Sequence, residues 1–397
     1  MSGDARAGAV LAAFARLGCT SFGGPIAHLG YFRAEFVTRR GWLAEAEYAD
    51  IVALCQFLPG PASSQVAVSL GLLRAGLPGG FAAWLGFTAP SALALILFAY
   101  GVNRVAALAQ AGWVHGLKIV AVAVVAQAVW GMARSLCPDR ERASLAVGAA
   151  VLALAVPSAA GQIGAIAIGG LIGWRLLPPP AAAAAPAGRI GFALPRLVAP
   201  VALALFFVLL AGLPVVAAAS GLHVAALVDR FYRAGALVFG GGHVVLPLLQ
   251  RAVVPPGWIS PTGFLAGYGA AQAVPGPLFT FAAYLGAAMR PGPSGWLGGI
   301  VCLGAIYLPS FLLLLGVLPY WDRLRGVAPV QAALRGVNAA VVGLLLAALY
   351  TPVWTSAITG PASFAIGLAA FLLLVAWRVP PWLVVGLGAA AGAMLLG

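Results

Sequence analysis

The stretch "AVPGPLF" (273–279) puts a Pro-Gly-Pro in the middle of apolar sequence, and "FLPGPAS" (57–63) does the same earlier in the chain. A glutamine stands three residues before each motif, at Gln56 and Gln272. Proline removes a backbone donor and clashes with the preceding helical turn, and glycine is a poor helix former. The two motifs therefore predict two interrupted helices at corresponding places in the chain.

The composition indicates that these helices lie in a membrane. Of the 397 residues, 62% are hydrophobic and only 8% are charged, which is too little charge to cover a soluble protein of this length. Apolar runs of about twenty residues recur, and each can cross roughly 30 Å of hydrocarbon, as in 197–219 and 296–318. We therefore expect an all-α polytopic membrane protein.

The chain also repeats itself. "FARLGCTSFGGP" (14–25) aligns with "FYRAGALVFGGG" (231–242), and Pro59-Gly60-Pro61 aligns with Pro275-Gly276-Pro277 at nearly the same offset. A constant offset over long distances indicates an internal repeat. The expected divisions are a first repeat over 1–177, a Pro/Ala-rich linker with an extra transmembrane helix over 178–222, and a second repeat over 223–397.

Hydropathy predicts thirteen spans. They are 7–31, 44–75, 78–102, 112–136, 141–156, 158–177, 197–220, 223–250, 262–289, 294–319, 328–351, 356–375 and 379–396. Equivalent helices then lie an odd number of crossings apart, which inverts the second repeat. Arginine placement favours a cytoplasmic start, except that the cluster at 33–40 falls outside. A re-entrant 44–75 would move that cluster inside with the N-terminus outside, and would make the repeats parallel unless another span is miscounted.

The breaks predict an anion site. Interrupted helices in a membrane are tolerated where they line a cavity or are buried in protein, and freed helix N-termini offer N–H donors and partial positive charge. The alternative is that proline and glycine merely kink packed helices. The break residues that we expect to bind substrate are Gly23, Gly24, Gln56, Pro59, Gly60, Pro61, Ser63, Gly240, Gly241, Gln272, Pro275, Gly276 and Pro277.

Ionisable residues within the spans give a second set of candidates, because such groups are costly in hydrocarbon. Arg16 and its repeat equivalent Arg233, together with Lys118, are expected to bind the anion, although they could instead snorkel to an interface. Asp229 stands four residues before Arg233, a spacing that allows a helical ion pair. The candidate proton-coupling residues are His28, Glu35, Asp50 and His243, which could instead be hydrogen-bonded core histidines and solvated carboxylates.

Other classes of function find little support. The four cysteines are scattered, with no metal-ligand spacing, so we expect no metal and no cofactor. There is no catalytic constellation, which argues against an intramembrane enzyme. The net charge of +13 is carried almost wholly by arginines spread singly over short loops, so nucleic acid is not an expected partner. The expected partners are an anion, protons and the lipid bilayer, and a homodimer is one assembly open to the chain.

Taken together, the motifs resemble those of the chromate ion transporter family, in its long-chain, two-domain form. "FGGPIAHLGYFRAEFVTRRGWLAEAEYADIVALCQFLPGP" (22–61) and its second-repeat counterpart (239–277) carry Phe-Gly-Gly, Gly-Trp, Gln and Pro-Gly-Pro in the family's order. The resemblance covers essentially the whole chain. It implies a multi-pass protein of the bacterial inner membrane that exports chromate, confers chromate resistance and uses the proton motive force as an antiporter.

Two features leave the function open at this point. Chromate and sulfate are both tetrahedral dianions, so a sulfate or other oxyanion carrier is the alternative, and a channel is another. The second repeat also departs from the first, because Gly242 replaces Pro25 and most of the charged cluster at 33–50 is missing. The two halves are therefore expected to do unequal work, with coupling in the first.

Overall fold

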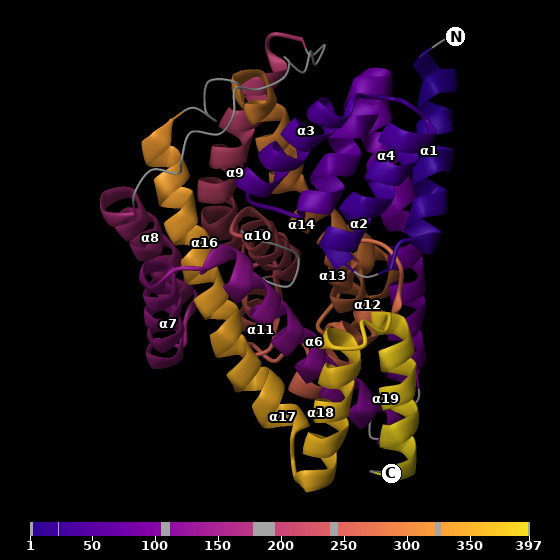
Figure 1. The fold of residues 1–397 in the computed structure, drawn as a ribbon, viewed down its shortest axis with the longest axis vertical. Coiled ribbons are helices and arrows are strands. Elements are labelled where there is room, and N and C mark those ends of the chain that lie inside the picture. The colour runs from indigo at the N-terminus through magenta and orange to yellow at the C-terminus, as the bar shows by residue number, and fades with distance from the viewer. Residues whose placement is uncertain are drawn as a thin grey trace.

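The structure is a computed structural model that describes residues 3–22, 24–104, 112–177, 195–238, 245–321 and 327–395. Throughout these ranges the regular elements are helices (Figure 1). The first repeat contains α1 (Gly3–Thr20), α2 (Gly24–Phe32), η1 (Arg33–Arg39), α3 (Glu45–Phe57), α4 (Ala62–Arg104), α6 (Gly112–Leu136), α7 (Arg140–Ala155) and α8 (Ala159–Leu176). Helix α9 (Val198–Ser220) follows and is mostly exposed, as a lipid-facing helix would be.

The second repeat has the same order of elements. It contains α10 (His223–Ala236), α11 (Val245–Val253), α12 (Pro261–Ala273), η3 (Leu278–Thr280), α13 (Phe281–Ala288), α14 (Gly295–Val317), η4 (Leu318–Tyr320), α16 (Ala328–Ala348), η5 (Leu349–Trp354), α17 (Thr355–Ala357), α18 (Pro361–Val375) and α19 (Pro381–Leu395). Within the described ranges, five helices are long and apolar enough to cross a membrane: Ala62–Gly101, Gly112–Leu136, Val198–Ser220, Gly295–Tyr320 and Ala328–Thr351.

In the first repeat, the chain reverses at both predicted breaks. The rings of Phe14 and Phe36 stack with centroids 4.7 Å apart, and the Cys55 sulfur lies 3.9 Å from the Ser69 hydroxyl. In a continuous helix, these pairs would be about 33 Å and 21 Å apart. Helix α1 therefore forms one hairpin with α2 and η1, and α3 forms a second hairpin with the start of α4.

The second repeat reverses at the equivalent places. The Arg230 guanidinium donates to the Ala252 carbonyl across the first break at 2.5 Å. The Tyr284 hydroxyl donates to the Gly263 carbonyl across the Pro-Gly-Pro at 2.8 Å. Each repeat thus begins with two helical hairpins, and the described tips include Pro59-Gly60-Pro61 and Pro275-Gly276-Pro277.

Helix α4 also folds back, shortly after its hairpin. Its backbone leaves helical geometry at Ala75 and Gly76, where Gly76 has φ +64°. The two arms then approach so closely that a Cβ on Gly71 would lie 2.2 Å from the Gly79 carbonyl oxygen. The second repeat repeats this contact, because a Cβ on Gly286 would lie 2.1 Å from the Gly298 oxygen. The long second arm of α4 and the equivalent α14 therefore run back past their own hairpins.

These reversals change how the predicted spans are counted. The segments 7–31, 44–75, 223–250 and 262–289 each return to the face from which they start. Between α1 and α10, the second arm of α4, α6 and α9 each cross the membrane once. Helices α7 and α8 form a consecutive pair that goes out and back, so together they add an even number of crossings. The total is odd, so the second repeat is inverted relative to the first.

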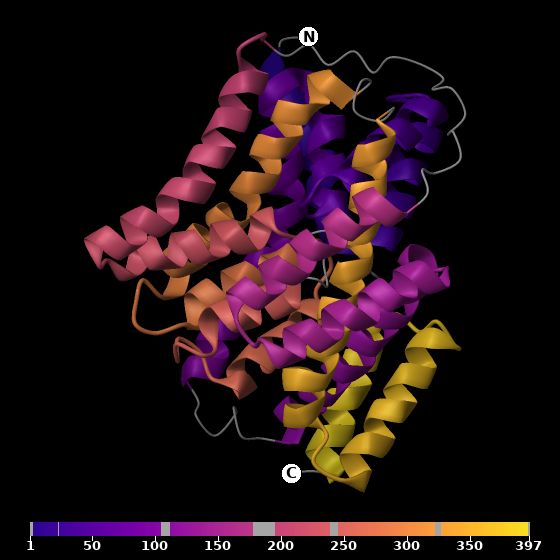
Figure 2. The same ribbon diagram turned by 90° about the vertical axis from the view of Figure 1, so that its left-hand side faces the viewer.

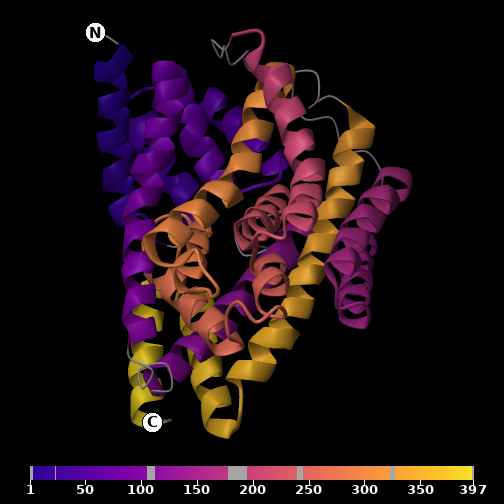
Figure 3. The same ribbon diagram turned by 180° about the vertical axis from the view of Figure 1, so that it is seen from behind.

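The figures agree with this path. Figures 1 and 3 show the start of α1 and the end of α19 toward opposite ends of the long axis. In Figure 2, α9 runs along the outside and connects the two repeats. The re-entrant alternative considered for 44–75 is therefore correct, but it leaves the inversion intact because the segment 7–31 is re-entrant as well.

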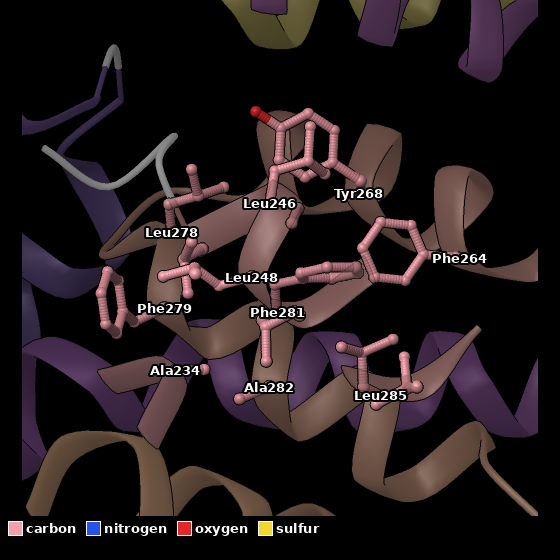
Figure 4. Packing of buried hydrophobic residues seen from close by; sticks show 14 of the residues in the cluster. Ala234, Leu246, Leu248, Phe264, Tyr268, Leu278, Phe279, Phe281, Ala282 and Leu285 are labelled. Atoms are coloured by element: carbon pink, nitrogen blue, oxygen red, sulfur yellow. The ribbon is translucent and has the colours of Figure 1, made fainter. Parts of the chain in front are cut away.

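Aromatic packing holds the hairpins in place. In the second repeat, Phe281 lies edge-on to Phe264 with ring centroids 5.1 Å apart and also contacts Tyr268 (Figure 4). In the first repeat, Phe14, Phe32 and Phe36 form a buried cluster that holds the first hairpin together. Because large buried aromatic pairs resist displacement, each repeat presents its two tips as part of one packed unit.

The inverted path makes a direct prediction about accessibility. In a variant whose four native cysteines are replaced by alanine or serine, we introduce Ala44→Cys or Ser294→Cys, both at exposed positions. Residue 44 lies where the first hairpin has returned to its starting face, and residue 294 lies beyond the hairpins of the inverted repeat. A membrane-impermeant maleimide should label one of the two in intact cells and the other only after permeabilisation. Labelling of both from the same face would contradict the inversion.

Candidate functional site

The hairpin tips of the two repeats meet and pair reciprocally. The Gly60 N–H of the first repeat donates to the Val238 carbonyl of the second at 2.6 Å, and the Gly276 N–H of the second donates to the Ser21 carbonyl of the first at 2.9 Å. Gly60 and Gly276 are equivalent in the repeat, and so are Ser21 and Val238. Such exchanged contacts are what a two-fold relation between the halves produces. Each Pro-Gly-Pro is therefore held by the opposite repeat.

Glycine is required at both Pro-Gly-Pro centres. Gly60 has φ +124° and Gly276 has φ +104°, a region that other residues rarely adopt. A Cβ on Gly60 would lie 2.6 Å from the Ser310 hydroxyl, and a Cβ on Gly276 would lie 2.9 Å from the Ser91 hydroxyl. Ser91 and Ser310 each follow a proline within a long helix of the other repeat. The Pro-Ser pair is repeated in the sequence, but nothing in the local sequence indicates that its serines lie at the tips.

The tips are surrounded by buried polar side chains. The Gln65 amide donates to the Pro59 carbonyl at 2.9 Å, and the Thr280 hydroxyl donates to the Pro277 carbonyl at 2.8 Å, so a side chain braces each tip. The buried polar residues around the tips are Ser21, Ser63, Ser64, Gln65, Ser91, Thr280 and Ser310. Among the described residues, the hydroxyls of Ser21 and Ser310 and the Gln65 carbonyl oxygen have no hydrogen-bond partner. Buried groups of this kind are normally paired, so they are available to a ligand.

His28 joins three segments of the first repeat. Its Nε2 lies 3.2 Å from the Ser21 carbonyl, and its Nδ1 lies 3.4 Å from the Ser63 hydroxyl. A carbonyl only accepts, so Nε2 carries the proton, and Nδ1 of the neutral ring accepts from Ser63. The side chain is 1% exposed and packs edge-on to Phe87. Of the predicted coupling residues that the structure describes, His28 is the one in contact with a tip.

The predicted cations lie apart from the tip contacts. Arg16 is exposed on α1, and Lys118 is half-buried on α6 with no hydrogen-bond or ion-pair partner among the described residues. Arg233 pairs with Asp229, which confirms the ion pair predicted from their spacing. None of the three donates a hydrogen bond to a tip within the described ranges. Backbone N–H groups, hydroxyls, an amide and one imidazole therefore make up the tip junction.

The two carboxylate candidates lie outside this junction. Arg39 and Arg40 both pair with Glu35. Partial burial of Glu35 favours its protonated form, but the hydrogen bonds from the two arginines outweigh this and hold the pKa of Glu35 below its ordinary value. Asp50 is half-buried on α3. A carboxylate clamped by two guanidinium groups is a poor acceptor for a proton near neutral pH.

Several predicted residues fall elsewhere or outside the described part of the chain. Gln56 is exposed on α3, whereas its equivalent Gln272 is half-buried on α12. Gly24 opens α2 with φ +77°. The predicted site residues that lie outside the described ranges are Gly23, Gly240, Gly241 and His243. A cavity of about 480 Å³ between α7 and α8 has a mainly apolar lining and lies away from the tips.

Known proteins resemble the chain in both halves. The family described as chromate transporter matches residues 8–174 and 225–393. A chromate transport protein of Pseudomonas aeruginosa is 30% identical, covering 93% of this chain and 87% of that protein. A probable chromate transport protein of Synechococcus elongatus is 26% identical over 96% of this chain and 93% of its own. An uncharacterized transporter of Methanocaldococcus jannaschii is 26% identical over 85% and 82%. No solved structure matches.

Substituting the tip glycines tests the junction. We expect Gly60→Ala and Gly276→Ala each to lower the thermal stability of the purified protein, because the backbone conformation alone costs about 1–3 kcal/mol in a residue with a side chain. The double variant Gly60→Ala with Ser310→Gly removes the clash with the Ser310 side chain, so it should recover part of the loss. Gly8→Ala, which adds a Cβ in open space on α1, is the matched control. Melting temperatures equal to that of Gly8→Ala would contradict the tip geometry.

Proposed function

The chain belongs to the chromate transporter family, which matches both of its repeats, and on that premise we propose that it exports chromate from the cytoplasm and confers chromate resistance. The observation that carries this proposal is the reciprocal pairing of the tips through Gly60 and Gly276. It brings the repeated motifs of the chain to one junction between the repeats. Two relatives named for chromate transport support chromate as the substrate.

The chemistry of the junction suits a tetrahedral oxyanion. Two backbone N–H groups, of Gly60 and Gly276, are engaged with protein carbonyls. The oxygens of an oxyanion could replace those carbonyls, and the unpartnered hydroxyls of Ser21 and Ser310 could add further hydrogen bonds. Helix N-termini after the Pro-Gly-Pro motifs favour negative charge. The described junction would thus bind an anion chiefly through oriented dipoles.

The same contacts suggest how access alternates. Each tip hydrogen bond joins one repeat to the other, and a backbone hydrogen bond contributes only about 0.5–1.5 kcal/mol net. Substrate oxygens at the junction would compete with the Ser21 and Val238 carbonyls and loosen the connection. The two packed units could then rock relative to each other and expose the junction to the opposite face, as in other inverted-repeat carriers.

The arginines support a cytoplasmic start for the chain. On the face where α1 begins lie Arg33, Arg39, Arg40, Arg74, Arg134, Arg140, Arg142, Arg175 and Arg196. On the opposite face lie Arg104, Arg230, Arg251 and Arg290. Positively charged loops face the cytoplasm, and the cluster at 33–40, an exception when the hairpins were counted as spans, now follows the rule. We propose the bacterial inner membrane as the location.

We further propose that the proton motive force drives export, in an antiport with protons. His28 is the coupling candidate that its contacts favour, because a proton on Nδ1 would turn that atom from acceptor to donor and reverse the hydrogen bond to Ser63. Ser63 lies in the first turn of α4, directly after the tip. Protonation would therefore act on the segment that holds Gly60.

A sulfate carrier is the second candidate. Sulfate has the shape and charge of chromate, and no group at the described junction distinguishes chromium from sulfur. The two candidates share one site and one mechanism, so competition measurements separate them. A channel is the third candidate and differs in kinetics, because its flux would not saturate and would show no coupling to protons.

Transport is tested in inside-out vesicles that contain the purified protein. With an imposed pH gradient, we expect saturable uptake of labelled chromate above the level of empty vesicles, because inside-out vesicles convert export into uptake. If unlabelled sulfate inhibits the uptake of labelled chromate more strongly than unlabelled chromate does, the result would favour the sulfate carrier. Uptake equal to that of empty vesicles would refute chromate export.

The coupling role of His28 has its own test. His28→Gln retains a donor for the Ser21 carbonyl but cannot take up a proton. We expect it to exchange labelled for unlabelled chromate at equal pH and to lose accumulation driven by a pH gradient. Glu35→Gln is the control and should retain both activities, because its carboxylate is held ionised by Arg39 and Arg40. Gradient-driven accumulation at the wild-type level in His28→Gln would remove His28 from coupling.

A further inference from the structure

A cleft of about 360 Å³ lies beside the tip of the first hairpin and is lined by both repeats. The first repeat contributes Phe22, Tyr31 and Gln127, and the second contributes Arg378 from the turn between α18 and α19 and Trp382 from the start of α19. We propose that this cleft is a second oxyanion site, a vestibule in which Arg378 binds the dianion before it reaches the tip junction. The inference rests on the proposed function for the identity of its ligand.

The length of the helix before it would put Arg378 within the thickness of a membrane. It stands in the turn that follows α18, a helix of 15 residues, which is about 22 Å long and too short to cross a hydrocarbon core of about 30 Å. Arg378 has no hydrogen-bond or ion-pair partner among the described residues. A cation at this depth is costly and is retained for function by default. An anion in the cleft would supply the missing partner.

The backbone of Arg378 points to the same conclusion. Its φ of +53° is left-handed, and it is the one such non-glycine residue in the described part of the chain. A glycine would adopt this conformation without strain. The turn is held there by hydrogen bonds from the Val379 N–H to the Leu373 carbonyl at 3.0 Å and from the Trp377 N–H to the Leu372 carbonyl at 3.3 Å. An arginine at a position suited to glycine indicates that its side chain is needed.

The cleft is connected to the tip junction. The Phe22 and Trp382 rings approach with centroids 5.9 Å apart, which joins the first tip to the turn of the second repeat. Phe22 directly follows Ser21, whose carbonyl accepts the Gly276 N–H. Gln127 donates to the Leu374 carbonyl at 3.2 Å and so fixes α6 against the end of α18. An anion in this cleft would therefore lie on the same side as Phe22, the residue that follows the reciprocal tip contact at Ser21.

The first repeat has no matching cation. The equivalent turn, between α7 and α8, consists of Val156, Pro157 and Ser158 and carries no charge. A guanidinium can hold a tetrahedral oxyanion through two parallel hydrogen bonds. The same chemistry would recognise the phosphate of a lipid headgroup, so the test must distinguish a free dianion from a lipid.

The test follows Trp382 fluorescence in vesicles of neutral phosphatidylcholine, taken as the difference between wild type and Trp382→Phe. We expect added sulfate to change this emission saturably, and Arg378→Gln to weaken the apparent affinity about tenfold. Arg378→Gly removes the cation while relieving the backbone strain, so it should be at least as stable as wild type and still lose the response. Arg175→Gln, at the exposed end of α8, is the matched control and should respond normally.

Three outcomes would overturn the vestibule. One is an equal response to sulfate in Arg378→Gly and wild type. Another is a wild-type response to phosphatidylglycerol in the vesicles with none to sulfate, which would identify a lipid site. The third is a chromate flux with an unchanged KM in Arg378→Gln. Because the titration does not require transport, wild-type protein that binds sulfate but moves no chromate would count against the proposed function alone.

Discussion

The fold depends on one constraint: a backbone N–H or C=O left unpaired in hydrocarbon costs several kcal/mol. The helical hairpins of both repeats end inside this protein, and the two Pro-Gly-Pro tips break the helical hydrogen-bond pattern. The chain meets the constraint by pairing the tips with each other, Gly60 to Val238 and Gly276 to Ser21. This reciprocal pairing is consistent with an inverted second repeat, whose tips enter from the opposite face and meet those of the first repeat.

The sequence predicted the breaks and the repeat because both rest on local properties. Proline and glycine disfavour helix wherever they stand, and a duplicated motif is visible at any distance. What the sequence could not provide was the direction of the chain after each break. Reversal at 58–61 depends on contacts such as that between Cys55 and Ser69, which are set by packing of the whole hairpin. The thirteen-span count therefore left reversal at 44–75 as an alternative, and the inverted topology is retained because two such segments precede the first long crossing.

At the site, too, the local sequence predicted some residues, whereas others are brought there only by packing of the whole fold. Gly60 and Gly276 were predicted as site residues from their motifs, while Ser91 and Ser310 came to the tips only through the crossing of the long helices. Arg378 was not predicted because its importance lies in its depth and in its unpaired state, and neither is a property of the local sequence. Conversely, Arg16 was predicted from its place in an apolar helix, but the periodicity of α1 puts it on the exposed face.

The two repeats share one backbone plan but carry different charges, and this difference gives the carrier its chemistry. Arg16 and Arg233 occupy equivalent positions, yet only Arg233 has a buried carboxylate partner, Asp229. His28 stands at the first tip, and Arg378 stands in the second repeat beside that same tip. A symmetric carrier would have no means to treat its two faces differently. Here the symmetric backbone provides the reciprocal pairing of the tips, and the asymmetric side chains provide the groups through which the proposed coupling to a proton and an anion would bias that pairing.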